Sequence, residues 1–206
     1  MPQLRVKGES LLTMRNMMQD RSSLSGMQLI HGKWASRFIW AAVIQGLIIT
    51  IVTILILEPL SDFNISWYFS PSRVIAGGGA GTWMFTGYIL YLVVGVIGVA
   101  VTSIFYFYIE GIQGKVYSGL ANALAWGHYV FMNVGVAGSM LLMMWGGYMA
   151  GYAGTATAAG GLGYTTTEIH EKILGQLTNP IGALVLLAAL GAILGGLGFI
   201  IRTRSK

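Results

Sequence analysis

Apolar residues in this chain gather in four long runs that contain no Asp, Glu, Lys or Arg. The runs cover residues 38–57, 82–109, 118–149 and 180–201. A helix rises about 1.5 Å per residue, so about 20 residues cross the ~30 Å hydrocarbon core of a bilayer. The pattern therefore predicts an all-α, polytopic membrane protein, with a bundle of four transmembrane helices over residues 38–201.

The segment before the first run is basic and weakly amphipathic. Within residues 1–37, Leu11, Met14, Met17 and Met18 share one side of a helical wheel. This arrangement is typical of an interfacial helix that lies along the lipid headgroups while its arginines reach the water. A polar tail is the alternative, because serines and a glycine soon interrupt the pattern.

Proline and glycine positions predict where the helices begin and end. Pro59 ends the first helix because proline lacks an N–H and disfavours helical geometry in the residue before it. The loops at residues 58–81 and 150–178 are expected to be irregular. Pro180 is expected in the first turn of the fourth helix, where the missing N–H costs nothing. The glycine run at residues 77–81 lacks the Lys-Ser/Thr of a phosphate-binding loop, so it predicts a hinge or surface loop.

The placement of charge predicts the orientation. The chain has twelve Lys and Arg residues. Six lie before the first run, one lies between the second and third runs, and three lie in a basic tail at residues 202–206, which makes ten on one side of the membrane. Arg73 and Lys172 fall in the other two loops. Because positive residues are retained on the cytoplasmic face, both termini are expected there. The expected location is the cytoplasmic membrane or an equivalent energy-transducing membrane.

Composition restricts the class of protein further. The chain is 55% hydrophobic and 9% charged, whereas a soluble domain is about a quarter charged. The absence of cysteine excludes disulfides and thiolate-held metals. The net charge is +5, but the basic residues flank the apolar runs, which indicates lipids and not nucleic acid as partners.

Small residues within the runs predict how the helices pack. Gly191 and Gly195 in the fourth run and Gly135 and Ser139 in the third are each four residues apart, a spacing that lets helix backbones approach closely. Gln45 is the one strongly polar side chain of the first run and is expected to bond to a neighbouring helix. Four helices offer more such faces than they can use internally, which indicates other membrane subunits or a homo-oligomer as partners.

His128 and Met132 are the candidates for cofactor binding. His128 lies about ten residues into the third span, where an ionisable group is by default a functional hypothesis, and Met132 follows one turn later. Such a pair can ligate haem or copper. A structural role, with the neutral imidazole bonded to a neighbour such as Gln45, is the favoured alternative. Glu168, His170 and Glu171 are expected to form a solvated turn or helix start and not a metal site.

Residues 82–149 resemble the C-terminal helices of the catalytic subunit of haem–copper oxidases. The resemblance lies in the sequence His-Tyr-Val-Phe-Met-Asn-Val-Gly-Val at residues 128–136, in Gly147 further along, and in the span and tight turn that precede them. The family's His-x-His haem ligands have no counterpart in residues 85–90, and its copper-site His-His pair is also absent. The resemblance thus implies a supporting subunit, with any haem or copper held by partner subunits.

These observations give three functional hypotheses. The first is a non-catalytic accessory subunit of a larger membrane complex, most plausibly a respiratory or oxidase-type metalloenzyme, with no cofactor and no catalytic activity of its own. The second is a small oligomeric transporter or channel in which Gln45, His128 and Asn133 line a path. The third is a haem-binding membrane subunit that uses His128.

Overall fold

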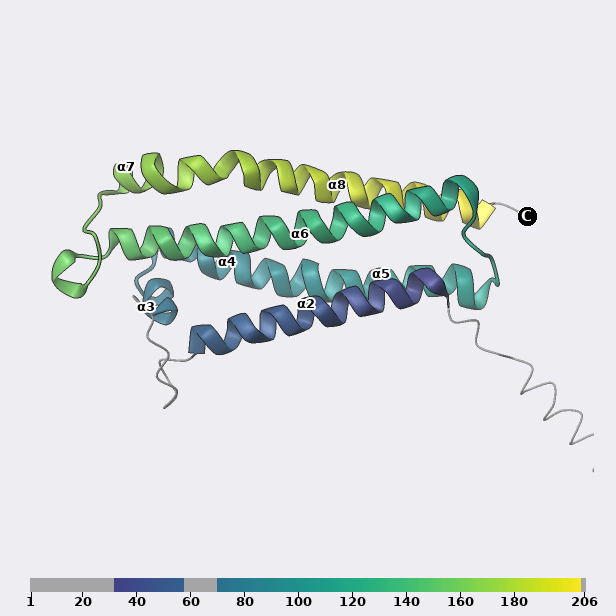
Figure 1. Cartoon of the computed structure of the whole chain (residues 1–206), viewed down its shortest axis with the longest axis horizontal. Coiled ribbons are helices and arrows are strands. Elements are labelled where there is room, and N and C mark those ends of the chain that lie inside the picture. The colour runs from purple at the N-terminus through teal and green to yellow at the C-terminus, as the bar shows by residue number, and fades with distance from the viewer. Residues whose placement is uncertain (1–31, 58–69, 205–206) are drawn as a thin grey trace, which may run out of the picture. The chain divides into compact units, whose positions relative to one another are not determined.

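The computed structural model describes residues 32–57 and 70–204, and its regular structure there is entirely helical (Figure 1). Four helices are long and apolar enough to cross a membrane, over Lys33–Leu57, Gly79–Ile112, Gly119–Gly154 and Thr166–Arg204. The predicted all-α class with four spanning helices is confirmed. The predicted interfacial helix falls almost wholly in residues that lie outside the described part.

The first and third spans are single α-helices, α2 (Lys33–Leu57) and α6 (Gly119–Gly154). The second is continuous but mixed: η2 (Gly79–Gly81), α4 (Thr82–Leu90), the π-helical η3 (Tyr91–Gly98), α5 (Val99–Phe107) and the π-helical η4 (Tyr108–Ile112). A π-helical turn holds more residues than an α-turn, so it changes which residues face a neighbouring helix. The short helix α3 (Pro71–Ala76) precedes this span.

The fourth span begins earlier than its sequence predicts. α7 (Thr166–Ile169), the π-helical η6 (His170–Leu174) and α8 (Gly175–Arg204) form one continuous helix. Thr165 and Glu168 form a capping box that starts this helix, and Lys172 bonds to Glu168 at 2.9 Å. The predicted loop at residues 150–178 therefore shrinks to residues 155–165, which include the 3-10 turn η5 (Thr157–Ala159), and Pro180 lies inside α8, not in a first turn. Local capping outweighs the proline signal here.

α6 occupies the middle of the bundle. It packs along α8 on one side and α4 on another, while α2 packs on α5 and η3 (Figure 1). The chain reverses at every connection, so the starts of α2 and α6 and the ends of η4 and α8 meet at one end. Of the described basic residues, Lys33, Arg37, Lys115, Arg202 and Arg204 lie at this end, and Arg73 and Lys172 at the other.

The predicted glycine faces join α6 to α8. A Cβ on Gly135 would lie 2.5 Å from the backbone N of Ala188, and one on Gly191 would lie 2.5 Å from the backbone N of Met132. Ser139, fully buried, donates to the carbonyl O of Gly135 at 2.6 Å. α6 and α8 thus bury these two faces against each other, as expected of closely spaced small residues; the expectation of partner subunits or a homo-oligomer stays a prediction.

Candidate functional site: a buried histidine beside an intramembrane cavity

His128 lies on α6 and is 7% exposed. Its Nδ1 is 3.1 Å from the Tyr106 hydroxyl oxygen, and its Nε2 is 3.1 Å from the Met132 sulfur. A thioether sulfur only accepts hydrogen bonds, so the neutral ring carries its proton on Nε2 and accepts from the Tyr106 hydroxyl at Nδ1. Both ring nitrogens are thus engaged by side chains of this protein.

Gly195 makes the room that the imidazole occupies. A Cβ at Gly195 would fall on the ring, with His128 Nδ1 as the nearest atom. The sequence singles out Gly195 as a packing residue and His128 as a chemical one. The structure shows that the two residues pack directly against each other, because the His128 ring on α6 occupies the space beside Gly195 on α8.

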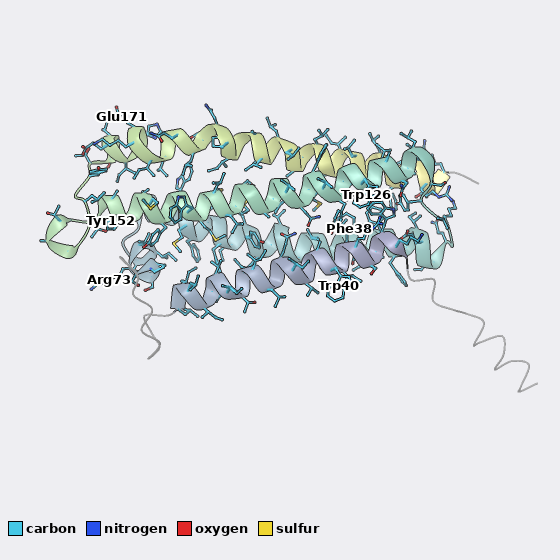
Figure 2. All side chains as sticks on the ribbon, in the orientation of Figure 1. Phe38, Trp40, Arg73, Trp126, Tyr152 and Glu171 are labelled. Carbon is cyan, nitrogen blue, oxygen red and sulfur yellow. The ribbon has the colours of Figure 1, made fainter. Side chains whose placement is uncertain are left out.

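Two aromatic rings, those of Phe38 and Tyr106, pack against the His128 ring. The rings of Phe38 and Tyr106 stack with centroids 4.9 Å apart, and the Phe38 ring lies 5.0 Å from the imidazole. Further out, the guanidinium of Arg37 lies 4.3 Å and 4.5 Å from the ring centroids of Trp34 and Trp126. Figure 2 shows Phe38 and Trp126 toward the end of the bundle at which α2 and α6 begin. Cation–π contacts of this kind are worth on the order of 1 kcal/mol.

A cavity of about 470 Å³ opens beside the histidine, between α5, α6 and α8. Its walls are mostly apolar, and the lining residues that carry a polar group are His128, Tyr106, Tyr117 and Thr102. The full lining is Thr102, Phe105, Tyr106, Tyr117, His128, Met132, Ala192, Gly195, Gly196, Phe199 and Ile200.

The geometry of His128 and Met132 does not suit axial ligation of one haem iron. Metal–ligand bonds of about 2 Å place two ligands on opposite faces about 4 Å apart, whereas Nε2 and the sulfur are 3.1 Å apart. Within residues 32–57 and 70–204, no group of three or more His, Cys, Asp or Glu side chains is placed to hold a metal ion. The pair is therefore not placed to bind one haem iron from opposite faces, and in this structure it forms a hydrogen bond; copper ligation by the pair stays a hypothesis.

Gln45 meets Asn133, not His128. The Gln45 Nε2 donates to the Asn133 Oδ1 at 2.6 Å, and the Asn133 Nδ2 donates to the carbonyl O of Tyr129 at 2.7 Å. Gln45 therefore ties α2 to α6, as its role in helix packing predicts. Its Oε1 is buried against Gly95 and finds no hydrogen-bond partner among the described residues.

Sequence reasoning missed the role of Glu110. This carboxylate is buried and accepts hydrogen bonds from the backbone N–H groups of Trp34 at 2.9 Å and Ala35 at 3.2 Å. These amides belong to the first turn of α2, where N–H groups have no partner within the helix. The available signal was an acidic residue placed directly at the end of an apolar run.

The other polar candidates do not form a site. Glu168 is engaged by Thr165 and Lys172 at the start of α7, and His170 and Glu171 are exposed on the next turn. The predicted helix start is confirmed.

No protein-family model, curated protein or solved structure matches the chain. Fold and site together define an all-α integral membrane protein with four long apolar helices.

Proposed function

We propose that this protein is a non-catalytic accessory subunit of a larger membrane complex. The observation that carries the proposal is that the two polar candidates of the spans bond to side chains of the same chain: His128 to Tyr106 and Met132, and Gln45 to Asn133. A catalytic or transport site keeps some of these groups available for a substrate. Here His128 and Gln45 each bond to a side chain of a neighbouring helix, Tyr106 on α5 and Asn133 on α6.

The outer surface of α8 supports association with other subunits. α8 packs mainly on α6, and the rest of its surface is apolar, with Leu186 and Ile193 among its most exposed side chains. A helix held on one side offers a long face to another helix.

The resemblance of residues 82–149 to the C-terminal helices of the haem–copper oxidase catalytic subunit makes a respiratory or oxidase-type assembly the first candidate. In such an assembly the chain would pack against the helices of cofactor-bearing subunits and hold no haem or copper itself. An orientation with both termini in the cytoplasm belongs to the same proposal, because the more basic end of the bundle carries Lys33, Arg37, Lys115 and the end of α8.

Native electrophoresis of gently solubilised source membranes, with detection of an epitope-tagged full-length chain, tests the proposal. We expect the chain to migrate with larger subunits and to co-purify with them. Migration at the mass of this chain or a simple multiple of it would support the oligomeric transporter instead. A Soret band in the spectrum of the chain purified alone would contradict the absence of haem.

A further inference from the structure

We propose that the cavity beside His128 is a binding site for one acyl chain of an anionic phospholipid, with its headgroup at the basic end of the bundle. The proposal does not depend on whether the protein is an accessory subunit.

The depth of the cavity matches one leaflet. Its walls on α8 run from Ile200, close to the end of the helix, to Ala192. This wall rises about 12 Å, and the helix rises about 15 Å from Arg202, the first basic residue beyond it, to Ala192, which is half of the ~30 Å hydrocarbon core. A chain that enters beside the headgroups would therefore reach the bottom of the cavity at the middle of the bilayer. The volume of about 470 Å³ is within the range of small-molecule sites.

The walls favour an apolar chain over a ligand with a polar ring. His128 and Tyr106 face each other, and the second nitrogen of His128 is turned to Met132. The Thr102 hydroxyl donates to the carbonyl O of Gly98 at 2.8 Å. A quinone or similar ring needs a hydrogen-bond donor. Tyr106, Thr102 and His128 are already engaged, which leaves Tyr117 as the remaining polar residue of the lining, whereas an acyl chain needs no donor.

The positive charge at the end of α8, next to the cavity residue Ile200, favours an anionic headgroup. The Lys115 ammonium donates to the carbonyl O of Thr203 at 2.8 Å, which fixes this cation beside the end of α8. Tyr117 forms part of the cavity wall. Its burial and then the negative charge of Glu110 raise its pKa to about 12, whereas the positive charge of Arg202 lowers this pKa. The carboxylate of Glu110 accepts hydrogen bonds from the backbone N–H groups at the start of α2. Basic pockets between membrane helices commonly bind anionic headgroups.

Two glycines of α8 give a matched test. A Cβ on Gly196 meets nothing within 4 Å, and Gly196 lines the cavity; a Cβ on Gly182 also meets nothing within 4 Å, but Gly182 lies far from the cavity on the same helix. Gly196→Phe should fill the cavity without disturbing the α6–α8 contact, and Gly182→Phe is its control. Ala192→Leu is a second filling variant should Gly196→Phe fold poorly.

The experiment is native mass spectrometry of the full-length, delipidated chain in detergent, with dioleoyl phosphatidylglycerol or dioleoyl phosphatidylcholine added. We expect one phosphatidylglycerol to stay bound to wild type and Gly182→Phe and to be lost from Gly196→Phe and Ala192→Leu. Arg202→Gln should bind it about fivefold more weakly, since one basic residue near the headgroups is lost, and Arg73→Gln at the opposite end should bind it normally.

Three results would overturn the proposal. Equal retention by wild type and both filling variants would show that the lipid binds elsewhere. Equal retention of phosphatidylglycerol and phosphatidylcholine would exclude selection for an anionic headgroup. Displacement of bound phosphatidylglycerol by an equimolar short-chain quinone would assign the cavity to a ring-bearing ligand.

Discussion

The carboxylate of Glu110 accepts a hydrogen bond from the backbone N–H of Trp34, 76 positions away in the chain, at 2.9 Å. It accepts a second from Ala35, so one side chain of the second span satisfies two N–H groups at the start of the first span. The helix dipole places partial positive charge at the same point. Gly32 allows the approach, because a Cβ there would fall on the carboxylate.

Replacing Glu110 should loosen the junction between the first two spans. We expect Glu110→Ala to lower the free energy of unfolding by about 1–3 kcal/mol, because two buried N–H groups lose their acceptor. Glu110→Gln keeps an acceptor oxygen and should lose less. SDS titration of the protein in mixed micelles measures both, with the exposed Glu171→Gln as control. A Glu110→Ala protein as stable as this control would show that the contact contributes nothing.

Gly195 and Gly196 are neighbours that should respond oppositely to alanine. Gly195→Ala places a methyl group on the His128 ring and should cost about 1–3 kcal/mol through overpacking. Gly196→Ala places its methyl group in open space and should be neutral or stabilising, because alanine is the better helix former. Thermal unfolding in detergent compares them.

The clash at Gly195 should disappear when the histidine is removed. We expect Gly195→Ala to be less damaging in a His128→Ala background than in wild type, because the added methyl group then meets vacated space. A double-mutant cycle of unfolding free energies measures this coupling. Strict additivity of the two changes would contradict the described contact.

The Tyr106 hydroxyl should contribute through its bond to His128. Tyr106→Phe removes only that hydroxyl and should cost about 0.5–2 kcal/mol, a range typical of hydrogen bonds between membrane helices. Met132→Leu keeps the apolar volume and should cost less, since the bond to sulfur is weaker. A greater loss in Met132→Leu, together with loss of bound haem or copper, would point to ligation instead.

Gln45 and Asn133 should behave as a pair. Gln45→Leu leaves the Asn133 carboxamide without its partner on α2, and Asn133→Leu does the same to Gln45. Each single change is expected to cost more than the double change, because the double variant leaves no unpaired amide in the membrane. Unfolding in mixed micelles measures the three variants. If both residues line a transport path, single variants with wild-type stability should instead lose transport in proteoliposomes.

Several expectations from sequence changed because three-dimensional neighbours intervened. His128 was expected to form a hydrogen bond with a neighbour such as Gln45. In the structure His128 bonds to Tyr106 on α5, and Gln45 bonds to Asn133. Gly135 and Gly191 were expected to let helix backbones approach closely, and only the structure shows that the two helices they join are α6 and α8. The fourth helix was expected to begin at Pro180, but the capping box at Thr165 starts it earlier.

The sequence by itself determined the number of spanning helices, their approximate limits and the end of the bundle at which positive charge accumulates. These properties depend on local free energies: the transfer of apolar side chains into lipid and the cost of leaving backbone groups unpaired there. Only the tertiary structure decided which polar groups form hydrogen bonds. Glu110 bonds to the backbone of Trp34, and His128 bonds to Tyr106 and packs against Gly195. A hydrogen bond between helices depends on which faces pack and at what register, and uncharged apolar runs contain almost no periodic signal that specifies either.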